Sequence, residues 1–558
     1  MMVKEGIGGD SDEASGGENM IGFPIPYRGQ AFKTAAVALA IMSLSATGFW
    51  MYHLFIGPQG AKVDGAGNSK SAARLFQNWP KNKQPDLVLV LSGETFSYLQ
   101  PCGCSSPQHG GLARRYNFIQ SLVKGRNWPV VALDLGDVAQ KSGPQTLLKY
   151  TTMMTALKTM EYAAVAIGRN EMAMPLIDAL SEYTLNNPLP RVLAANLLKK
   201  EENFPTMVKS FEVVARQGAP KVGVVGVVHP NVGREVNDPS VKFEDVETNL
   251  LATLKDLQAK KPEVLVLLFQ GMIAEAKKCA RQYPQFHVIL CLSPEQDPPG
   301  TPEEVGRTLI VTVGHKGRFL GTVGVFRTGT PDSPIELYYQ LVLLTPEYET
   351  PEGKDASNPV HALMEEYAKK VKADNYLAQY PKSAHPIQRE LAFKDAVYVG
   401  SEKCYKCHEH AYKVWKNSTH SHAYESLEKA ARPSLRQYDG ECVACHVTGF
   451  GYNSGYKEET GKPNLKQVGC ESCHGPGSLH AKWASESKEQ KALLALMNPY
   501  KTPEKETPEA AKRRELLLDL SCQKCHDQDN DVHWSIEKWA KIVHNEPKAA
   551  IPNPPARK

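Results

Sequence analysis

The last third of the chain carries one short pattern four times, Cys-x-x-Cys-His. This spacing is the attachment signature of c-type haem, in which each thiol bonds to a haem vinyl group and the adjacent His becomes the proximal iron ligand. Random placement of the 12 Cys and 17 His in 558 residues predicts only about 0.007 copies. The sequence therefore predicts four covalently bound haem c groups. The copies lie at Cys404/Cys407/His408, Cys442/Cys445/His446, Cys470/Cys473/His474 and Cys522/Cys525/His526.

Zinc binding is the alternative interpretation of these pairs, because Cys-x-x-Cys also builds tetrahedral zinc sites. Two such pairs normally make one site with four Cys ligands, and that arrangement gives no reason for a His after every second Cys. Here the His follows all four pairs. The pattern therefore favours haem over zinc.

An apolar segment near the N-terminus, residues 31–56, predicts a transmembrane anchor because it has no charge after Lys33 and is long enough to cross a bilayer as a helix. Trp50 and Tyr52 suit a membrane interface, and Arg28 suits a cytoplasmic start. A cleaved signal peptide is the alternative; the long, partly acidic stretch before the segment and the lack of a clear cleavage site disfavour it. Haem attachment in bacteria takes place outside the cytoplasmic membrane. We therefore expect a single-pass protein of the bacterial cytoplasmic membrane with its bulk in the periplasm.

The middle of the chain, residues 85–348, predicts an α/β layered domain. Its short apolar runs indicate strands buried on both faces, and helix-prone segments at 146–160 and 244–260 separate some of them. Before this domain we expect a disordered cytoplasmic tail over 1–30 and a linker over 57–84. The predicted strands lie at 86–92, 130–135, 163–168, 221–228, 263–269, 287–292, 308–314 and 321–326.

The remainder divides into a polar connector, 349–395, with a helical stretch at 361–380, and a haem region, 396–558. The haem region is too short to bury a conventional core beside four haems. We therefore expect a mainly α domain in which the haems are the core. The net charge of +4 and the 23% of charged residues indicate no nucleic-acid partner.

The second axial ligand decides whether a haem carries electrons or binds a small molecule. Met497 is the only Met beyond residue 400, so Met/His ligation is open to one haem at most. Histidines are more plentiful, and bis-His ligation is therefore the expected type. Those that are not part of a motif are His410, His420, His422, His480, His533 and His544.

Segments 404–427, 442–456, 468–480 and, more loosely, 522–544 resemble the tetrahaem cytochrome c-554 family, electron acceptors of hydroxylamine oxidoreductase. The element ESCHGPG is the most demanding part of this resemblance. The resemblance implies three distal ligands and one five-coordinate haem, bound through Cys442 and Cys445. His422 and His533 depart from the family pattern, and either could close the fourth site. The implied distal ligands are His420, His480 and His544.

The α/β region resembles the metallophosphoesterase domain of 5′-nucleotidase-like proteins. The resemblance rests on SGETFSYLQPCGC, GGLARR, LDLGD, GRNE and VGHKGRFLGTVGV, in that order. Catalysis in that family needs two metals held by Asp and His. Here Asp137 survives, but Glu94, Phe96, Asn170 and Gln270 stand around positions where the family has a ligating Asp or His. We expect a degenerate fold of this kind without phosphoesterase activity.

Four cysteines lie outside the haem motifs, and all of them fall in the α/β region. Cys102 and Cys104 flank one Gly and are too close to bridge each other comfortably. Bridges from them to Cys279 or Cys291 are one alternative in an oxidising compartment, and a thiol or metal site with His109 is another.

Three functions are compatible with these features. The favoured one is an electron-transfer protein that carries electrons through mainly bis-His haems between redox partner proteins, with a multihaem oxidoreductase as one candidate. The alternative is a multihaem enzyme that acts on a small nitrogen or sulfur compound at one five-coordinate haem. The third is a binding module in which the α/β domain docks a partner. Beyond redox partners, the sequence predicts contact with the membrane through the N-terminal helix alone.

Overall fold

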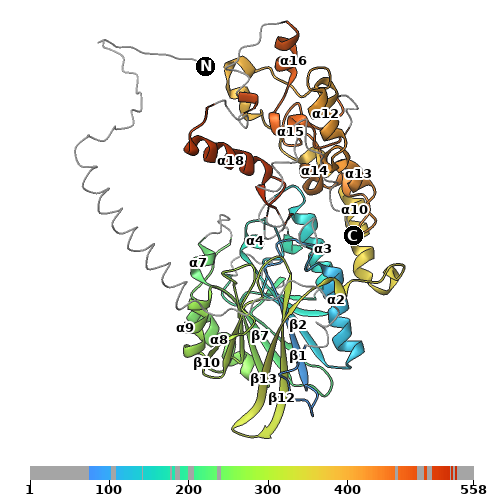
Figure 1. Ribbon diagram of the computed structural model, residues 1–558. Helices are drawn as coiled ribbons and strands as arrows, with labels where there is room; N and C mark the ends of the chain where they lie inside the picture. The colour runs from blue at the N-terminus through green and yellow to red at the C-terminus, as the bar shows by residue number, and fades with distance from the viewer. Residues whose placement is uncertain are drawn as a thin grey trace, which may run out of the picture. The chain divides into compact units, whose positions relative to one another are not determined.

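The structure, a computed structural model, describes most of the chain after residue 74 (Figure 1). The predicted tail and the predicted anchor, 31–56, lie outside the described residues. In the part of the chain described here, no helix is long and apolar enough to cross a membrane. The described residues are 75–101, 108–140, 143–175, 179–181, 189–198, 207–234, 241–458, 463–486, 496–498, 505–527, 530–531 and 534–536.

The α/β region contains two mixed sheets, of seven and six strands. In the first, the order is β13-β12-β1-β2-β3-β4-β5; strands β1 to β5 run parallel, and β12 and β13 add an antiparallel edge. Its strands are β1 (Leu87–Ser92), β2 (Val130–Asp134), β3 (Tyr162–Ala166), β4 (Arg191–Leu193), β5 (Val208–Lys209), β12 (Phe319–Thr330) and β13 (Ser333–Leu343).

The second sheet has the order β10-β11-β9-β8-β7-β6, in which β11, β9, β8 and β7 run parallel and both edge strands are antiparallel. Strands β7 and β8 are buried along their whole length, as their unbroken apolar runs predict. The strands are β6 (Phe211–Val214), β7 (Val222–Val228), β8 (Val264–Gln270), β9 (Val288–Cys291), β10 (Glu303–Val305) and β11 (Thr308–Val311).

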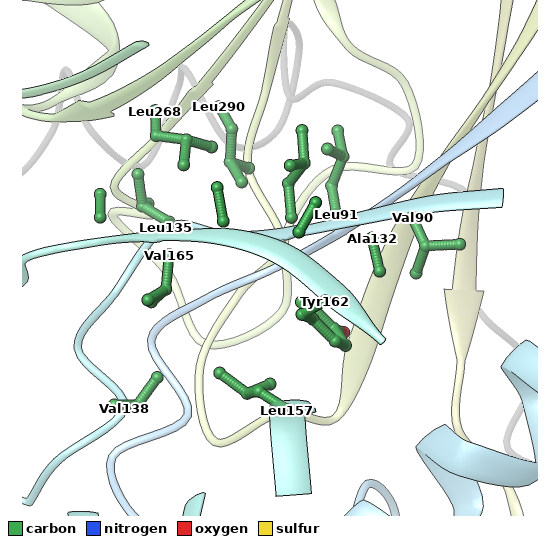
Figure 2. Packing of buried hydrophobic residues seen from close by; sticks show 14 of the residues in the cluster. Val90, Leu91, Ala132, Leu135, Val138, Leu157, Tyr162, Val165, Leu268 and Leu290 are labelled. Atoms are coloured by element: carbon green, nitrogen blue, oxygen red, sulfur yellow. The ribbon is translucent and has the colours of Figure 1, made fainter. Parts of the chain in front are cut away.

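The main core lies between the two sheets. Leu268 and Leu290 of the second sheet point toward the first, and Leu157 lies on the opposite side of the first sheet (Figure 2). Leu157 belongs to α3 (Thr146–Thr159), so the order of layers is helix, sheet, sheet, with α8 and α9 packed on the second sheet. The predicted α/β layering is confirmed. The helices here are α2 (Leu112–Gln120) with the π-helical η2 (Ser121–Gly125), α4 (Arg169–Met172), α7 (Pro230–Gly233), α8 (Val246–Gln258) and α9 (Ile273–Gln282).

Two segments expected to connect domains pack against the α/β core instead. Phe76 and Trp79, in the described part of the predicted linker, are buried and contact Trp128. Helix α10 (Pro359–Ala373) lies beside α3 and α2 and joins the same core (Figure 1). It begins at a standard N-cap, because the Asn358 side chain accepts from the Val360 amide at 3.1 Å.

The haem region consists of short helices joined by loops. Among its described residues, with Leu377 and Phe393 of the connector, the largest cluster of buried apolar side chains has nine members and a second has three. That bound haem completes this core stays a prediction. The elements of the haem region are α12 (Glu409–Lys416), α13 (Ala423–Glu428), α14 (Gly440–His446), α15 (Cys470–His474), α16 (Ser478–Ser485) and α18 (Pro508–Cys522), with 3-10 turns η7 (Ser401–Lys403), η8 (Thr419–His422) and η9 (Arg436–Tyr438). Before residue 396 the chain also forms α11 (Tyr376–Gln379) and the 3-10 turns η3 (Pro346–Tyr348), η4 (Asp355–Ser357), η5 (Pro386–Arg389) and η6 (Leu391–Phe393).

Candidate haem-binding site

Two motif histidines are held at Nδ1 by backbone carbonyl oxygens. The Nδ1 of His446 lies 2.7 Å from the carbonyl oxygen of Ala423, and that of His474 lies 2.9 Å from the carbonyl oxygen of Met497. A carbonyl oxygen can only accept, so each Nδ1 carries the proton and donates it. Each Nε2 is then left with a lone pair for iron.

His526 differs because a carboxylate holds it. Its Nδ1 donates to Asp531 Oδ2 at 2.9 Å, and the ring of Trp534 stacks on the imidazole at 4.6 Å between centroids. The indole N–H of Trp534 donates in turn to Asp519 at 2.8 Å. A carboxylate partner makes an imidazole a stronger donor to the metal than a carbonyl does. The fourth motif therefore has an electronic environment of its own.

Two pairs of histidines lie opposite each other. The ring centroids of His408 and His480 are 6.0 Å apart, as are those of His420 and His526. When two imidazoles ligate one metal ion from opposite sides, their ring centroids lie about 6 Å apart, because each metal–nitrogen bond is about 2 Å and each nitrogen is about 1 Å from its ring centre. Both pairs therefore fit an iron between two imidazoles. Burial lowers the pKa of His420 to about 4, with the nearby charges of His526 and His446 adding to the effect.

The cysteines of different motifs meet. The thiol of Cys404 neighbours that of Cys470, which raises the pKa of Cys404, and Cys525 raises the pKa of Cys445 in the same way. Burial raises the pKa of Cys522 to about 11, and the neighbouring thiol of Cys473 adds to that shift. The first motif therefore adjoins the third, the third adjoins the fourth, and the fourth adjoins the second.

Cys407, the second predicted attachment residue of the first motif, is placed differently from its partner Cys404. Residue Cys407 is exposed, whereas Cys404 is half-buried beside Cys470. An apolar haem edge, rather than protein, would be the neighbour of this exposed thiol when haem is attached. Its predicted bond to haem stays a prediction.

Glu471, the Glu of the ESCHGPG element, is a buried carboxylate that ties three parts of the region together. It accepts from the backbone N–H groups of Val399 at 3.0 Å, Gly400 at 2.7 Å and Gly477 at 2.7 Å. The segment with Gly400 leads into the first haem motif, and Gly477 precedes the helix with His480. Burial raises the pKa of Glu471. The sequence alone predicts no role for Glu471, although an acidic residue inside a haem motif is a visible signal.

Trp415 fixes the segment that carries His420. Its indole N–H donates to the carbonyl oxygen of Val468 at 2.8 Å, and the N–H of Val468 donates to the carbonyl oxygen of His420 at 3.1 Å. These two bonds join the stretch after the first motif to the stretch before the third. They explain why the Trp and His of this stretch occur together.

Other predicted ligands are placed away from the paired histidines. His422 is 52% exposed and its Nδ1 lies 3.2 Å from Glu425 Oε1, and His410 is exposed. The Met497 side chain packs in the small cluster with Phe393, while its carbonyl oxygen serves His474. His533 and His544 lie outside the described residues, so their predicted roles stay predictions.

In the α/β domain, backbone amides donate to one oxygen of Asp137 and to both oxygens of Glu171. Asp137 Oδ1 accepts from the Asn170 amide at 2.7 Å, and Glu171 accepts from the amides of Asp137, Ala139 and Gly168 at 2.9, 2.7 and 2.7 Å. Burial raises the pKa values of Asp137 and Glu171. Both side chains act as structural acceptors.

The replaced ligand positions are also engaged within the protein. Glu94 accepts from the Ser293 amide at 2.8 Å and lies 3.4 Å from His315 Nε2. Gln270 donates to the carbonyl oxygen of Leu135 at 2.6 Å. Within the described ranges, no group of three or more His, Cys, Asp or Glu side chains could hold a metal ion.

Two of the four cysteines of the α/β domain lie in the described part of the chain. Cys279 and Cys291 are buried in the second core cluster, and neither forms a disulfide among the residues that the structure covers. Cys102 and Cys104 lie outside the described residues. Burial lowers the pKa of His109. The two alternatives for these thiols therefore stay open.

Comparison with known proteins defines the class of the C-terminal region. Residues 403–475 match the family described as cytochrome c554 and c-prime. This region is therefore similar to a multihaem c-type cytochrome, and the similarity implies covalently bound haem c.

Among particular relatives, cytochrome c-554 of Nitrosomonas europaea is 36% identical over 143 residues, which are 24% of this chain and 58% of the relative. The chain thus spans less than two thirds of the length of this relative.

Solved structures with a related α/β fold include a 5′-nucleotidase precursor from Thermus thermophilus, with 23% identity, a TM-score of 0.44, and coverage of 53% of this chain and 61% of that one. Sulfate thiohydrolase SoxB from Thermus thermophilus is also similar, with 16% identity, a TM-score of 0.42, and coverage of 52% and 62%. The chain spans about three fifths of each.

Proposed function

We propose that this protein is a tetrahaem electron carrier, anchored in the bacterial cytoplasmic membrane, with its haem region in the periplasm. The observation that carries the proposal is that motif thiols are neighbours, Cys404 of Cys470 and Cys445 of Cys525. Neighbouring thiols would place the edges of the haems attached to them close together. Each haem, when bound, supplies a reversible one-electron Fe³⁺/Fe²⁺ couple.

The protein's own residues would bind and tune these haems. The motif histidines supply Nε2 because their Nδ1 atoms are committed to Ala423, Met497 and Asp531. His480 and His420 lie at the distance of second axial ligands for the first and fourth haems. The resemblance implies His544 as a further distal ligand.

Haem counting and electron paramagnetic resonance test this function. Four haems per chain by the pyridine haemochrome assay, with mainly low-spin ferric iron, are the expected result. Far fewer than four haems in correctly exported protein would reject the proposal.

The second candidate function is a redox enzyme with one five-coordinate haem, on Cys442 and Cys445. The exposure of His422 and its bond to Glu425 favour this candidate, because His422 is one of two residues that could close that site. Nitric oxide or cyanide should change the spectrum of one haem if the enzyme hypothesis holds. Unchanged spectra of all haems would support the electron-carrier function and reject the enzyme hypothesis.

The α/β domain has no phosphoesterase activity in this proposal, because its acidic side chains accept from backbone amides. Full-length protein incubated with Mn²⁺ and a phosphodiester substrate should show no turnover. Turnover that disappears in the Asp137→Ala variant would overturn this part.

The location is proposed from the apolar segment 31–56 and from the chemistry of haem attachment. Protease added to intact spheroplasts should digest the haem region and leave a membrane-bound N-terminal fragment. The electron donor and acceptor are proposed to be soluble or membrane-bound redox proteins.

A further inference from the structure

Helix α14, which carries the second haem motif, begins at Asp439. The side chain of Asp439 accepts from the Glu441 amide at 3.0 Å, and its carbonyl oxygen accepts from the amides of Cys442 at 3.1 Å and Val443 at 2.9 Å. Asp439 is therefore the N-cap of the short helix that ends at His446. Any residue that holds Asp439 also holds the attachment point of the second haem.

A buried network from outside the haem region holds Asp439. Gln145 precedes α3 of the α/β domain and is fully buried; its amide donates to Tyr367 at 2.6 Å and to Asp439 Oδ1 at 3.2 Å. Tyr367 donates to Asp439 Oδ2 at 3.3 Å. The hydroxyl of Tyr380 donates to the side-chain oxygen of Gln145, Oε1, at 2.6 Å. The network therefore holds both carboxylate oxygens of Asp439, the N-cap of α14.

An ion pair lies one turn further along α3. Lys149 is 6% exposed and pairs with Glu441, the residue before Cys442. Its ammonium group also donates to Gln140 at 3.1 Å. The charge of Lys149 is screened by water less than that of a surface lysine, while its partner Glu441 is 45% exposed.

Close packing leaves α14 little freedom at the same place. A Cβ atom on Gly440 would collide with the ring of Tyr380, so the first turn of α14 rests directly on that ring. Gly440 is itself buried. Helix α14 is therefore held by its N-cap, by the ion pair of Glu441 and by close packing of Gly440 against the Tyr380 ring.

We propose that α3 of the α/β domain positions the second haem, and that the charge of Lys149 raises the reduction potential of that haem. This inference rests on the proposed function, because it needs a haem on Cys442 and Cys445. Reduction adds one electron, taken from a redox partner, to ferric iron, and no bond forms or breaks. A nearby positive charge favours the reduced state. Without Lys149, the carboxylates of Asp439 and Glu441 would favour the oxidised state.

The experiment is a redox titration of the full-length, haem-loaded protein. In the Lys149→Glu variant, the potential of the second haem should fall, while the other three change little. In the Lys149→Glu/Glu441→Lys double variant, it should return toward the wild-type value. A variant with Ser in place of Cys442 and Cys445 identifies the titration step of this haem, because that step disappears.

The matched control is Lys277→Glu, which breaks an ion pair with Glu303 on the second sheet of the same domain. It should shift none of the four potentials. If Lys149→Glu folds poorly, Lys149→Met removes the charge alone and should give a smaller fall in the same step.

Three results would overturn the inference: no shift in Lys149→Met, an equal shift of all four haems, or no recovery in the double variant. The proposed function fails separately, through a haem count well below four in the wild-type protein. The Gln145→Leu variant tests separately whether the α/β domain positions the second haem. The variant should alter the electron paramagnetic resonance spectrum of that haem without changing the haem content. An unaltered spectrum would also count against the inference.

Discussion

His420 and His526 lie 6.0 Å apart between ring centroids, although one follows the first haem motif and the other belongs to the fourth. This relationship predicts that His420 is the second ligand of the fourth haem. The His420→Ala variant should convert one of the low-spin haems to a high-spin form that binds cyanide. Electron paramagnetic resonance of the oxidised protein measures the conversion.

His422 offers a matched control two residues away, because it is half exposed and bonded to Glu425. The His422→Ala variant should keep the wild-type number of low-spin haems. The assignment is wrong if His422→Ala gives the high-spin signal and His420→Ala does not.

Asp531 should lower the potential of the fourth haem, because its carboxylate accepts the Nδ1 proton of His526 at 2.9 Å and strengthens the imidazole as a donor to iron. The Asp531→Asn variant is expected to raise the potential of that haem alone. Spectroelectrochemical titration measures the change. Asp527→Asn removes an acidic charge from the same loop at a side chain that accepts from Asn530, and an equal rise there would show that charge, rather than the hydrogen bond to His526, is responsible.

Glu471 should stabilise the haem region through its bonds to the amides of Val399, Gly400 and Gly477. In the Glu471→Gln variant, the amide nitrogen would face at least one N–H donor. The free energy of unfolding should therefore fall by about 2 kcal/mol. Calorimetry of the haem-loaded protein measures the loss, and the exposed Glu402→Gln variant is the control. Equal stability of the two variants would contradict the role given to Glu471.

Asp137 should make the α/β domain less stable as the pH rises. Burial raises the pKa of Asp137 in the folded state, so the folded protein binds more protons than the unfolded one above pH values of about 4. Stability from this group is present at low pH and decreases as the pH rises through the folded pKa. The calorimetric transition of the domain should therefore come at a lower temperature near pH 8 than near pH 5.

The Asp137→Asn variant tests the same residue by removing its charge. The Oδ2 atom of Asp137 has no hydrogen-bond partner among the described residues, so an amide there displaces no donor. The variant should be more stable than wild type near pH 8, by on the order of 1 kcal/mol. A destabilised variant that also loses bound Mn²⁺ would indicate a metal site instead.

Local patterns predicted a large part of this protein. The strand at 222–228 and the helix at 146–159 follow from hydrophobic runs and periodicity, because a buried segment must be apolar wherever it packs. Haem attachment is equally local, since Cys442, Cys445 and His446 sit within one turn and a half of helix. For the same reason, the replaced residues at Glu94 and Gln270 were visible without coordinates.

The pairing of histidines and charges around the haem motifs comes from residues that are far apart in the chain. No spacing rule places His480 opposite His408, Asp531 behind His526, or Lys149 against Glu441. Ligation and charge effects depend on separations of a few ångströms, which folding sets independently of distance along the chain. Short motifs thus predict where haem would be attached, whereas three-dimensional packing decides which histidines face each other and which charges surround each predicted haem.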